Sequence, residues 1–154
     1  MQLFPSFELL IEAEPLAVRD GLAKILAALD PLALNVEDAA TVELVLAEVL
    51  NNVSEHAYRD KNSAPPIHVL CQPERRGLQF TVTDHGHPFP DAALPGDEPA
   101  ALDVERAALP EGGFGWSMIH ALARDIRYRR KASTNELTLC LPMKVASAIK
   151  DASS

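Results

Sequence analysis

A long amphipathic segment, residues 36–58, constrains the fold most strongly. Asn35 is a candidate N-cap residue, with Asp38 three residues later, so a helix is predicted to begin here. Five apolar residues recur at helical spacing on one face: Val42, Leu46, Val49, Leu50 and Val53. A helix with one apolar face buries it against another layer, and a 154-residue chain that is 47% hydrophobic can fill one such core. The sequence therefore predicts one domain built from two layers.

The remaining elements are predicted from periodicity and from turn residues. Residues 78–84 alternate apolar and polar side chains, as a half-buried antiparallel strand does. Residues 85–110 are rich in Pro, Asp, Ala and Gly, and so long an irregular segment suggests a functional lid, with a short helix near 100–108. The other expected elements are strands at 6–13, 67–72, 126–130 and 137–141, a helix at 16–29, a helix from 111–115 to about Arg124, a turn at 132–135, and a tail, 144–154, after a domain of residues 1–143.

Composition excludes several classes of protein. The formal net charge of −8 disfavours a nucleic-acid binder, because phosphate contacts need a basic surface. No apolar run approaches the roughly 20 residues that span a bilayer, and residues 1–5 do not resemble a secretory leader, so a cytoplasmic protein is expected. Cys71 and Cys140 lie in strand-like runs without a second ligand at metal spacing, and are expected to be buried free thiols.

Three polar features are candidates for chemistry. Glu48, Asn52 and His56 follow one another at intervals of four residues, which places them on one helix face. This face is either a solvated surface or a ligand site, and two adjacent asparagines at 51–52 favour the site because Asn costs roughly 0.6 kcal/mol in a helix interior.

The second feature is Asp84, which ends a predicted strand and is followed by a turn through Gly86. An aspartate held there can accept a hydrogen bond from an exocyclic amine, and the glycine lets a flat base approach the backbone. His85 and His87 have no further soft ligand nearby, which disfavours a metal site. The third feature is the glycine-rich run 112–115 before a helix, where free N–H groups favour phosphate, although the run matches neither the P-loop nor the Rossmann pattern.

The order of these features resembles the N, G1 and G2 boxes of the GHKL ATPase/kinase superfamily. The matching patterns are Glu48-x-x-x-Asn52-x-x-x-His56, Asp84-x-Gly86-x-x-Phe89 and Gly113-x-Gly115. Residues 48–58, and the ending Asp125-x-x-x-Tyr128 through Asn135-x-Leu137-x-Leu139, are most similar to the bacterial anti-sigma-factor serine kinases. The resemblance covers nearly the whole chain.

This resemblance implies an α+β fold, a two-layer α/β sandwich of the Bergerat type with a mixed, mostly antiparallel sheet and helices on one face. It implies ATP and Mg²⁺ as cofactors, with Glu48 as general base, Asn52 as the magnesium ligand and Asp84 bound to the adenine amine. The full set of implied nucleotide-binding residues is Asn52, Asp84, Gly86, Phe89, Gly112, Gly113 and Gly115. The implied partners are a STAS-type anti-sigma-antagonist protein, a sigma factor and a second copy of the chain, with no nucleic acid and no membrane.

The chain departs from the family pattern at two places. Trp116 stands where leucine is usual, and Glu111-Gly112 stands where many anti-sigma kinases carry a basic residue near the γ-phosphate. The second departure removes a candidate charge stabiliser, so transfer would be slow or would depend on Arg106 or another cation of the lid. Two functions therefore stay open: a serine/threonine protein kinase that acts as an anti-sigma factor, and a nucleotide-gated binding module that transfers no phosphate. A detached histidine-kinase catalytic domain is less favoured, because no helical hairpin with a phospho-accepting histidine is present.

Overall fold

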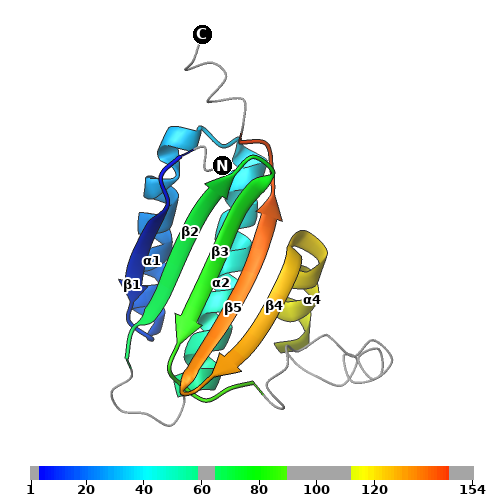
Figure 1. The fold of residues 1–154 in the computed structure, drawn as a ribbon. Coiled ribbons are helices and arrows are strands. Elements are labelled where there is room, and N and C mark those ends of the chain that lie inside the picture. The colour runs from blue at the N-terminus through cyan, green and yellow to red at the C-terminus, as the bar shows by residue number, and fades with distance from the viewer. Residues whose placement is uncertain (1–3, 59–64, 90–111, 146–154) are drawn as a thin grey trace.

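A computed structural model describes residues 4–58, 65–89 and 112–145 of the chain. It has two layers, a five-stranded sheet and a set of helices that covers one face of that sheet (Figure 1). The elements are β1 (Phe7–Ile11), α1 (Pro15–Ala28), the 3₁₀ turn η1 (Asp30–Leu32), α2 (Val36–Tyr58), β2 (Ile67–Glu74), β3 (Gly77–Asp84), α4 (Gly112–Leu122), β4 (Arg124–Lys131) and β5 (Thr134–Pro142). The predicted α+β sandwich is confirmed.

The strand order is β1-β2-β3-β5-β4, and all four pairs of described strands are antiparallel. The expectation of a mixed sheet is therefore wrong. The reason is the number of helices in the crossover between β1 and β2. Helices α1 and α2 run in opposite directions, so they return the chain to the end of the sheet at which β1 stopped (Figure 1). A strand that begins there runs antiparallel to β1.

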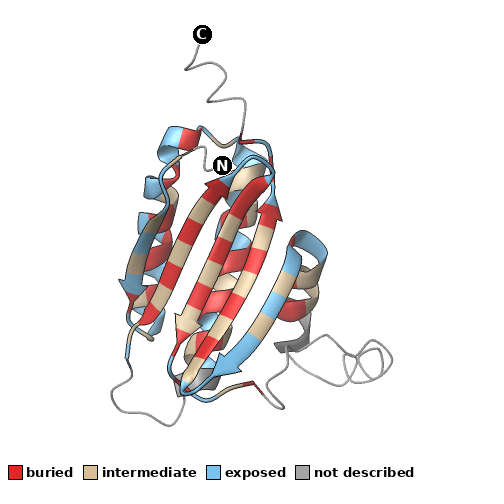
Figure 2. Ribbon diagram, viewed as in Figure 1, coloured by how far each residue is buried: buried red, intermediate tan, exposed pale blue. Residues whose placement is uncertain are grey.

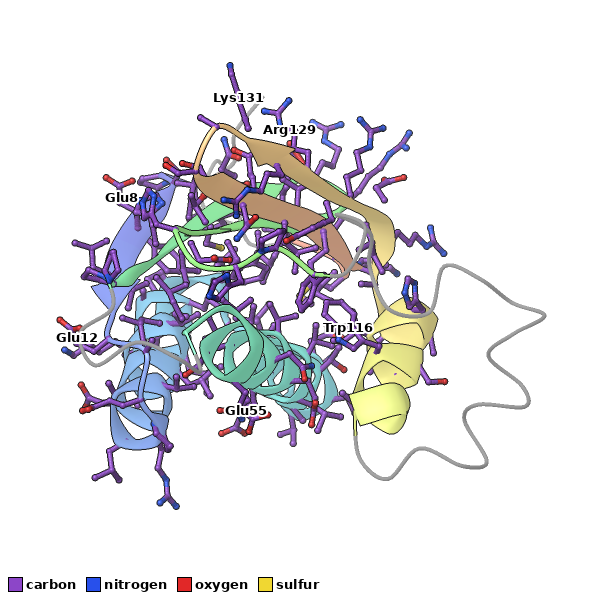
Figure 3. All side chains as sticks on the ribbon, turned by 90° about the horizontal axis from the view of Figure 1, so that it is seen from below. Glu8, Glu12, Glu55, Trp116, Arg129 and Lys131 are labelled. Carbon is purple, nitrogen blue, oxygen red and sulfur yellow. The ribbon has the colours of Figure 1, made fainter. Side chains whose placement is uncertain are left out.

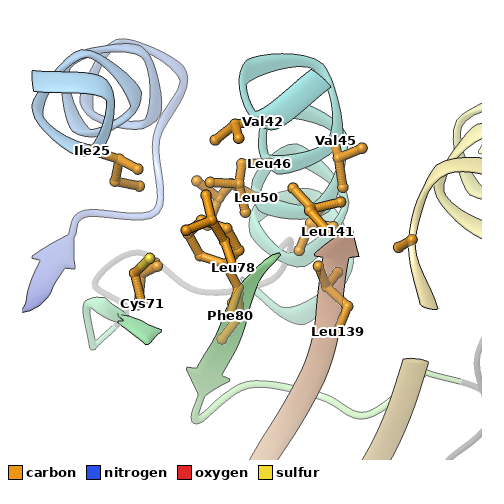
Figure 4. Close-up of a cluster of buried hydrophobic side chains, with 14 of the residues drawn as sticks. Ile25, Val42, Val45, Leu46, Leu50, Cys71, Leu78, Phe80, Leu139 and Leu141 are labelled. Carbon is orange, nitrogen blue, oxygen red and sulfur yellow. The ribbon is translucent and has the colours of Figure 1, made fainter. Parts of the chain in front are cut away.

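Helix α2 is the centre of the helical layer, as its apolar stripe predicts. The side-chain oxygen of Asn35 accepts a hydrogen bond from the backbone N–H of Asp38 at 2.7 Å, which confirms the N-cap. All five residues of the predicted stripe are buried. Figure 4 shows α2 side chains, among them Leu46 and Leu50, directed at Leu78 and Phe80 of β3. This contact fixes the distance between the two layers.

Burial alternates along the central strands β2, β3 and β5 (Figure 2). Their inward side chains meet the helices, whereas the outward side chains are half-buried. Cys71 points inward and is fully buried, and burial raises the pKa of its thiol to about 12. Cys140 is a free thiol on the other face and is only partly buried, so the expectation of two buried thiols holds for Cys71 alone.

The C-terminal elements differ from their predicted bounds. The helix expected to reach Arg124 ends at Leu122, because Arg124 already pairs with Cys140 of β5 and Asp125 has a left-handed φ of 53°. The β4–β5 connection is only two residues long, since Lys131 pairs with Thr134. Residues 90–110 of the expected lid and all but the first two residues of the tail lie outside the described residues. Among the helices described, none combines the length and apolar character that a bilayer crossing requires.

Candidate functional site

Four segments that are distant in sequence meet at one end of the sheet. The C-terminal half of α2, the end of β3, the first turn of α4 and the β4–β5 turn all lie at the lower end of the molecule in Figure 1. The antiparallel order produces this meeting, because β3 ends where β5 begins, and Asp84 is paired with Asn135. The residues predicted for chemistry therefore come together at this end.

Glu48 of α2 lies against Gly115 of α4. A methyl group placed on Gly115 would overlap the Glu48 carboxylate and would lie 2.9 Å from its Cδ atom. Only glycine leaves room for this contact. The half-buried Glu48 is thus directed at the first turn of α4, where the backbone N–H groups of residues 112–115 have no acceptor within the helix.

The glycine run forms this first turn rather than preceding it, because α4 begins at Gly112. Gly112 and Gly113 supply two of the four free N–H groups that a helix N-terminus offers. The helix dipole adds partial positive charge there, which favours an anionic ligand. The geometry of the turn is therefore suited to phosphate.

Asn52 follows Glu48 by one turn of α2 and is half-buried. Its Nδ2 atom is buried and has no hydrogen-bond partner among the described residues. A buried amide without a partner costs about 1–3 kcal/mol, which a protein rarely tolerates without a use for the group. The amide nitrogen of Asn52 is therefore left without a partner in this part of the protein. The side chain of His56 lies outside the described residues, and Glu55 is exposed and points away from the sheet (Figure 3).

Asp84 ends β3 and is 4% exposed. Its Oδ1 atom accepts two hydrogen bonds, from the backbone N–H of Gly86 at 2.9 Å and from the side chain of Asn135 at 2.7 Å. Its Oδ2 atom accepts none from the described residues. Burial raises the pKa of the Asp84 carboxyl, and the two hydrogen bonds and the nearby His85 and Arg130 oppose this rise. One carboxylate oxygen is thus held in place while the other is available to a donor.

Asn135 and Arg130 were not predicted as site residues. The Nδ2 atom of Asn135 also lies 3.1 Å from the carbonyl oxygen of Gly86 and 3.3 Å from that of His87. Arg130 donates to the same Gly86 carbonyl at 2.7 Å and to the side-chain oxygen of Asn135 at 2.9 Å. Asn135 could have been found from the alternation of β5, because it has the same parity as the buried Leu137 and a polar residue on a core face needs partners.

Phe89, the last residue of the G1 pattern, belongs to an aromatic cluster. Its ring meets Trp116 edge-on, with centroids 5.4 Å apart, and Tyr128 at 5.0 Å. Its backbone N–H donates to the Tyr128 hydroxyl at 3.0 Å. Trp116, the residue that replaces the usual leucine, is 3% exposed and lies between α2 and α4 beneath the sheet (Figure 3). Phe89 therefore packs the start of α4 against β4.

The described residues contain no group of three or more His, Cys, Asp or Glu side chains that could hold a metal ion. Any cation bound here would need other ligands, such as phosphate oxygens and water.

The family model that matches this chain describes a histidine kinase-like ATPase domain and covers residues 11–141. The chain belongs to the histidine kinase-like ATPase family. Membership of this family implies that the domain binds ATP. The matched range includes every candidate residue of the site. None of the curated proteins compared with the chain matches it.

Two solved structures are similar to the chain in fold. One contains the RsbU and RsbW domains of Rv1364c from Mycobacterium tuberculosis, with a TM-score of 0.59 and 19% identity over 92% of this chain and 34% of that one. The other is the histidine kinase domain of a blue-light activated histidine kinase from Erythrobacter litoralis EL346, with a TM-score of 0.54 and 18% identity over 86% of this chain and 63% of that one. The chain therefore spans about a third of the first structure and less than two thirds of the second, and the likeness concerns the fold.

Proposed function

We propose that this histidine kinase-like ATPase is an ATP-dependent serine/threonine protein kinase that acts as an anti-sigma factor. Its substrate would be a STAS-type anti-sigma-antagonist protein, and a sigma factor its second partner. The observation that carries the proposal is the contact between Glu48 and Gly115, because it brings a carboxylate to the helix turn suited to phosphate. A module that only clamps a partner has no need of a base at this point.

We assign each residue a role that agrees with its position in the site. The available oxygen of Asp84 would accept a hydrogen bond from the adenine amine, with the base lying over the turn at Gly86. The N–H groups at the start of α4 would hold phosphate oxygens. Glu48 would take the proton of a serine or threonine hydroxyl as that oxygen bonds to the γ-phosphorus and the bond to the bridging oxygen of ADP breaks.

In this proposal Asn52 would hold Mg²⁺ through its amide oxygen. One end of its amide is buried without a partner, and the side chain lies one turn from Glu48 on the same helix. The amide oxygen is a hard ligand of the kind that Mg²⁺ binds, together with phosphate oxygens and water. Bound Mg²⁺ would neutralise charge on the phosphates during transfer. Because nitrogen and oxygen of an amide are exchanged by a half-turn, either end can face the ligand.

The partner class is supported by the resemblance of residues 48–58 to the anti-sigma kinases and by the likeness to a structure with an RsbW domain. The Arg106 side chain, considered above as a charge stabiliser, lies outside the described residues. The alternative function, a nucleotide-gated binding module, is favoured by Glu111-Gly112, where many such kinases carry a basic residue.

The test is transfer of labelled γ-phosphate from ATP to a panel of STAS-domain proteins, run beside a binding assay on the same preparations. The wild type should label a serine or threonine, and Glu48→Gln should bind nucleotide and partner but label 10²–10⁴-fold more slowly. Glu55→Gln is the matched control, since Glu55 is an exposed carboxylate on the same helix. Loss of transfer in Glu55→Gln alone would assign the base to Glu55. A wild type that binds both ATP and a STAS protein without labelling it would establish the nucleotide-gated module instead.

A further inference from the structure

We infer that Arg130 and Asn135 are positioning residues that set the specificity of the site for a purine with an amino group at position 6. They do so by holding the Asp84 carboxylate and the turn at Gly86. This inference rests on the proposed nucleotide binding. It adds the residues that orient Asp84, the side chain that recognises the base.

The three side chains form one row across the end of the sheet. Asp84 is the register partner of Asn135 on β5, and Asn135 is the register partner of Arg130 on β4. Directly opposed residues on neighbouring strands share a face, so the row is set by the sheet itself. Its hydrogen bonds run in one direction, from Arg130 to the oxygen of Asn135 at 2.9 Å and from the nitrogen of Asn135 to Asp84 at 2.7 Å.

Arg130 determines which way the Asn135 amide faces. A guanidinium only donates, so it requires the amide oxygen on its side. The opposite side presents only acceptors to the amide nitrogen, namely the Asp84 carboxylate and the carbonyls of Gly86 and His87. Without Arg130 one of these two restraints is lost, and a half-turn of the amide would set its oxygen against the Asp84 carboxylate.

The orientation of Asn135 in turn determines what Asp84 can recognise. With Oδ1 bound by Asn135 and by the Gly86 N–H, the free Oδ2 can only accept a hydrogen bond while the carboxyl is ionised. It therefore suits the 6-amino group of adenine and opposes the 6-oxo group of hypoxanthine, which also only accepts. Arg130 also fixes the Gly86 carbonyl directly, at 2.7 Å, so the turn beside the base is held at two points.

The experiment compares ATP with ITP, which has a 6-oxo group in place of the 6-amino group. Arg130→Met is the main variant, because the exposed Arg130 can lose its guanidinium without a change in the core. Arg127→Met is the matched control, since Arg127 is an exposed arginine of the same strand with no hydrogen bond to the turn. Arg130→Lys keeps a donor and a charge. Asn135→Ala removes the central amide, and its fold is checked by circular dichroism because Asn135 is 1% exposed.

Arg130→Met should weaken ATP binding about tenfold and lower the ratio of ATP to ITP affinity by a similar factor, the size expected for one hydrogen bond to a charged group. Arg130→Lys should recover part of the ratio, and Arg127→Met should keep both values. A merely structural role would weaken both nucleotides equally and leave the ratio unchanged, which would overturn the inference. Failure of the wild type to bind ATP would overturn the proposed function itself, and so the two failures are distinguishable.

A second readout does not need nucleotide. Carbon-detected NMR titration of Asp84 should show a higher carboxyl pKa in Arg130→Met than in wild type, because a positive charge is lost and the Asn135 hydrogen bond is loosened. His85 and Asn135 face the same carboxyl and are unchanged in this variant. An Asp84 pKa that moves equally in Arg127→Met would contradict the positioning role.

Discussion

The carboxylate of Glu48 occupies the space that a side chain at Gly115 would need. The two residues belong to different helices, and a Cβ atom on Gly115 would lie 2.9 Å from Cδ of Glu48. Glycine inside a helix costs about 1 kcal/mol relative to alanine. Gly115 therefore lowers the stability of α4 but leaves room for the Glu48 carboxylate.

We therefore expect the effect of Gly115→Ala on stability to depend on whether Glu48 is present. In Glu48→Ala the overlap is absent, so the alanine should stabilise the protein by up to about 1 kcal/mol through helix propensity. With Glu48 present, the overlap should remove this gain and displace the carboxylate. Urea unfolding of the four proteins measures the coupling. Equal effects of Gly115→Ala in both backgrounds would show that the two side chains do not compete for this space.

Asp84→Asn should raise the stability of the nucleotide-free protein and weaken its binding of ATP. Because burial raises the pKa of Asp84, the folded state holds a proton that the unfolded state releases near the ordinary value of 3.8. The stability associated with this group is therefore greatest below that pH and is lost as pH rises through the folded-state pKa. Asparagine carries no charge and keeps an acceptor for Asn135. The nucleotide-free variant should thus be more stable than wild type at neutral pH, by about 0.5–2 kcal/mol, although it binds ATP less well.

The measurement is the free energy of unfolding of both proteins at several values between pH 4 and 7. The advantage of Asp84→Asn should grow as pH rises. A wild type that gains stability over the variant with rising pH would mean that the pKa of Asp84 is lowered by its partners rather than raised by burial.

Ala132→Gly should stabilise the β4–β5 turn, which joins the strands that carry Arg130 and Asn135. Ala132 has a φ of 56°, a left-handed conformation that costs a residue with a Cβ atom about 1–2 kcal/mol. Glycine removes this cost and adds some chain entropy to the unfolded state, so a net gain of about 0.5–1 kcal/mol is expected in thermal or urea unfolding. Ser133→Gly is the matched control, because Ser133 does not have a positive φ. It should lower stability or leave it unchanged, and a gain as large as that of Ala132→Gly would refute the explanation by strain.

Local patterns were sufficient to predict most of the elements. The stripe of α2, its Asn35 cap and the alternation of β3 depend on neighbours within one or two turns of chain, and all three are confirmed. The antiparallel sheet and the place of β5 between β3 and β4 depend on contacts between distant segments, which periodicity does not encode.

The site residues also fall into those that local sequence predicts and those that it does not. The sequence identified Glu48 and Asn52 because they share one face of a helix. It identified Asp84 because this residue ends a strand before a turn. Asn135 was assigned to a turn because the sequence 132–135 is rich in small polar residues, whereas the actual turn has two residues and Asn135 lies in the strand. Arg130 could not be identified, since an arginine among five basic residues of β4 shows no local sign of its contact with Gly86.

Isothermal titration calorimetry with ATP and Mg²⁺ tests the proposed nucleotide site formed by α2, β3 and α4. The wild type should bind Mg·ATP. Asn52→Ala should weaken binding in the presence of Mg²⁺ more than in its absence, because the amide is assigned to the metal. Asp84→Asn should lose about 1.5–3 kcal/mol of binding free energy in both conditions. Absence of wild-type binding at millimolar Mg·ATP, or binding that neither substitution changes, would show that these residues do not form the site.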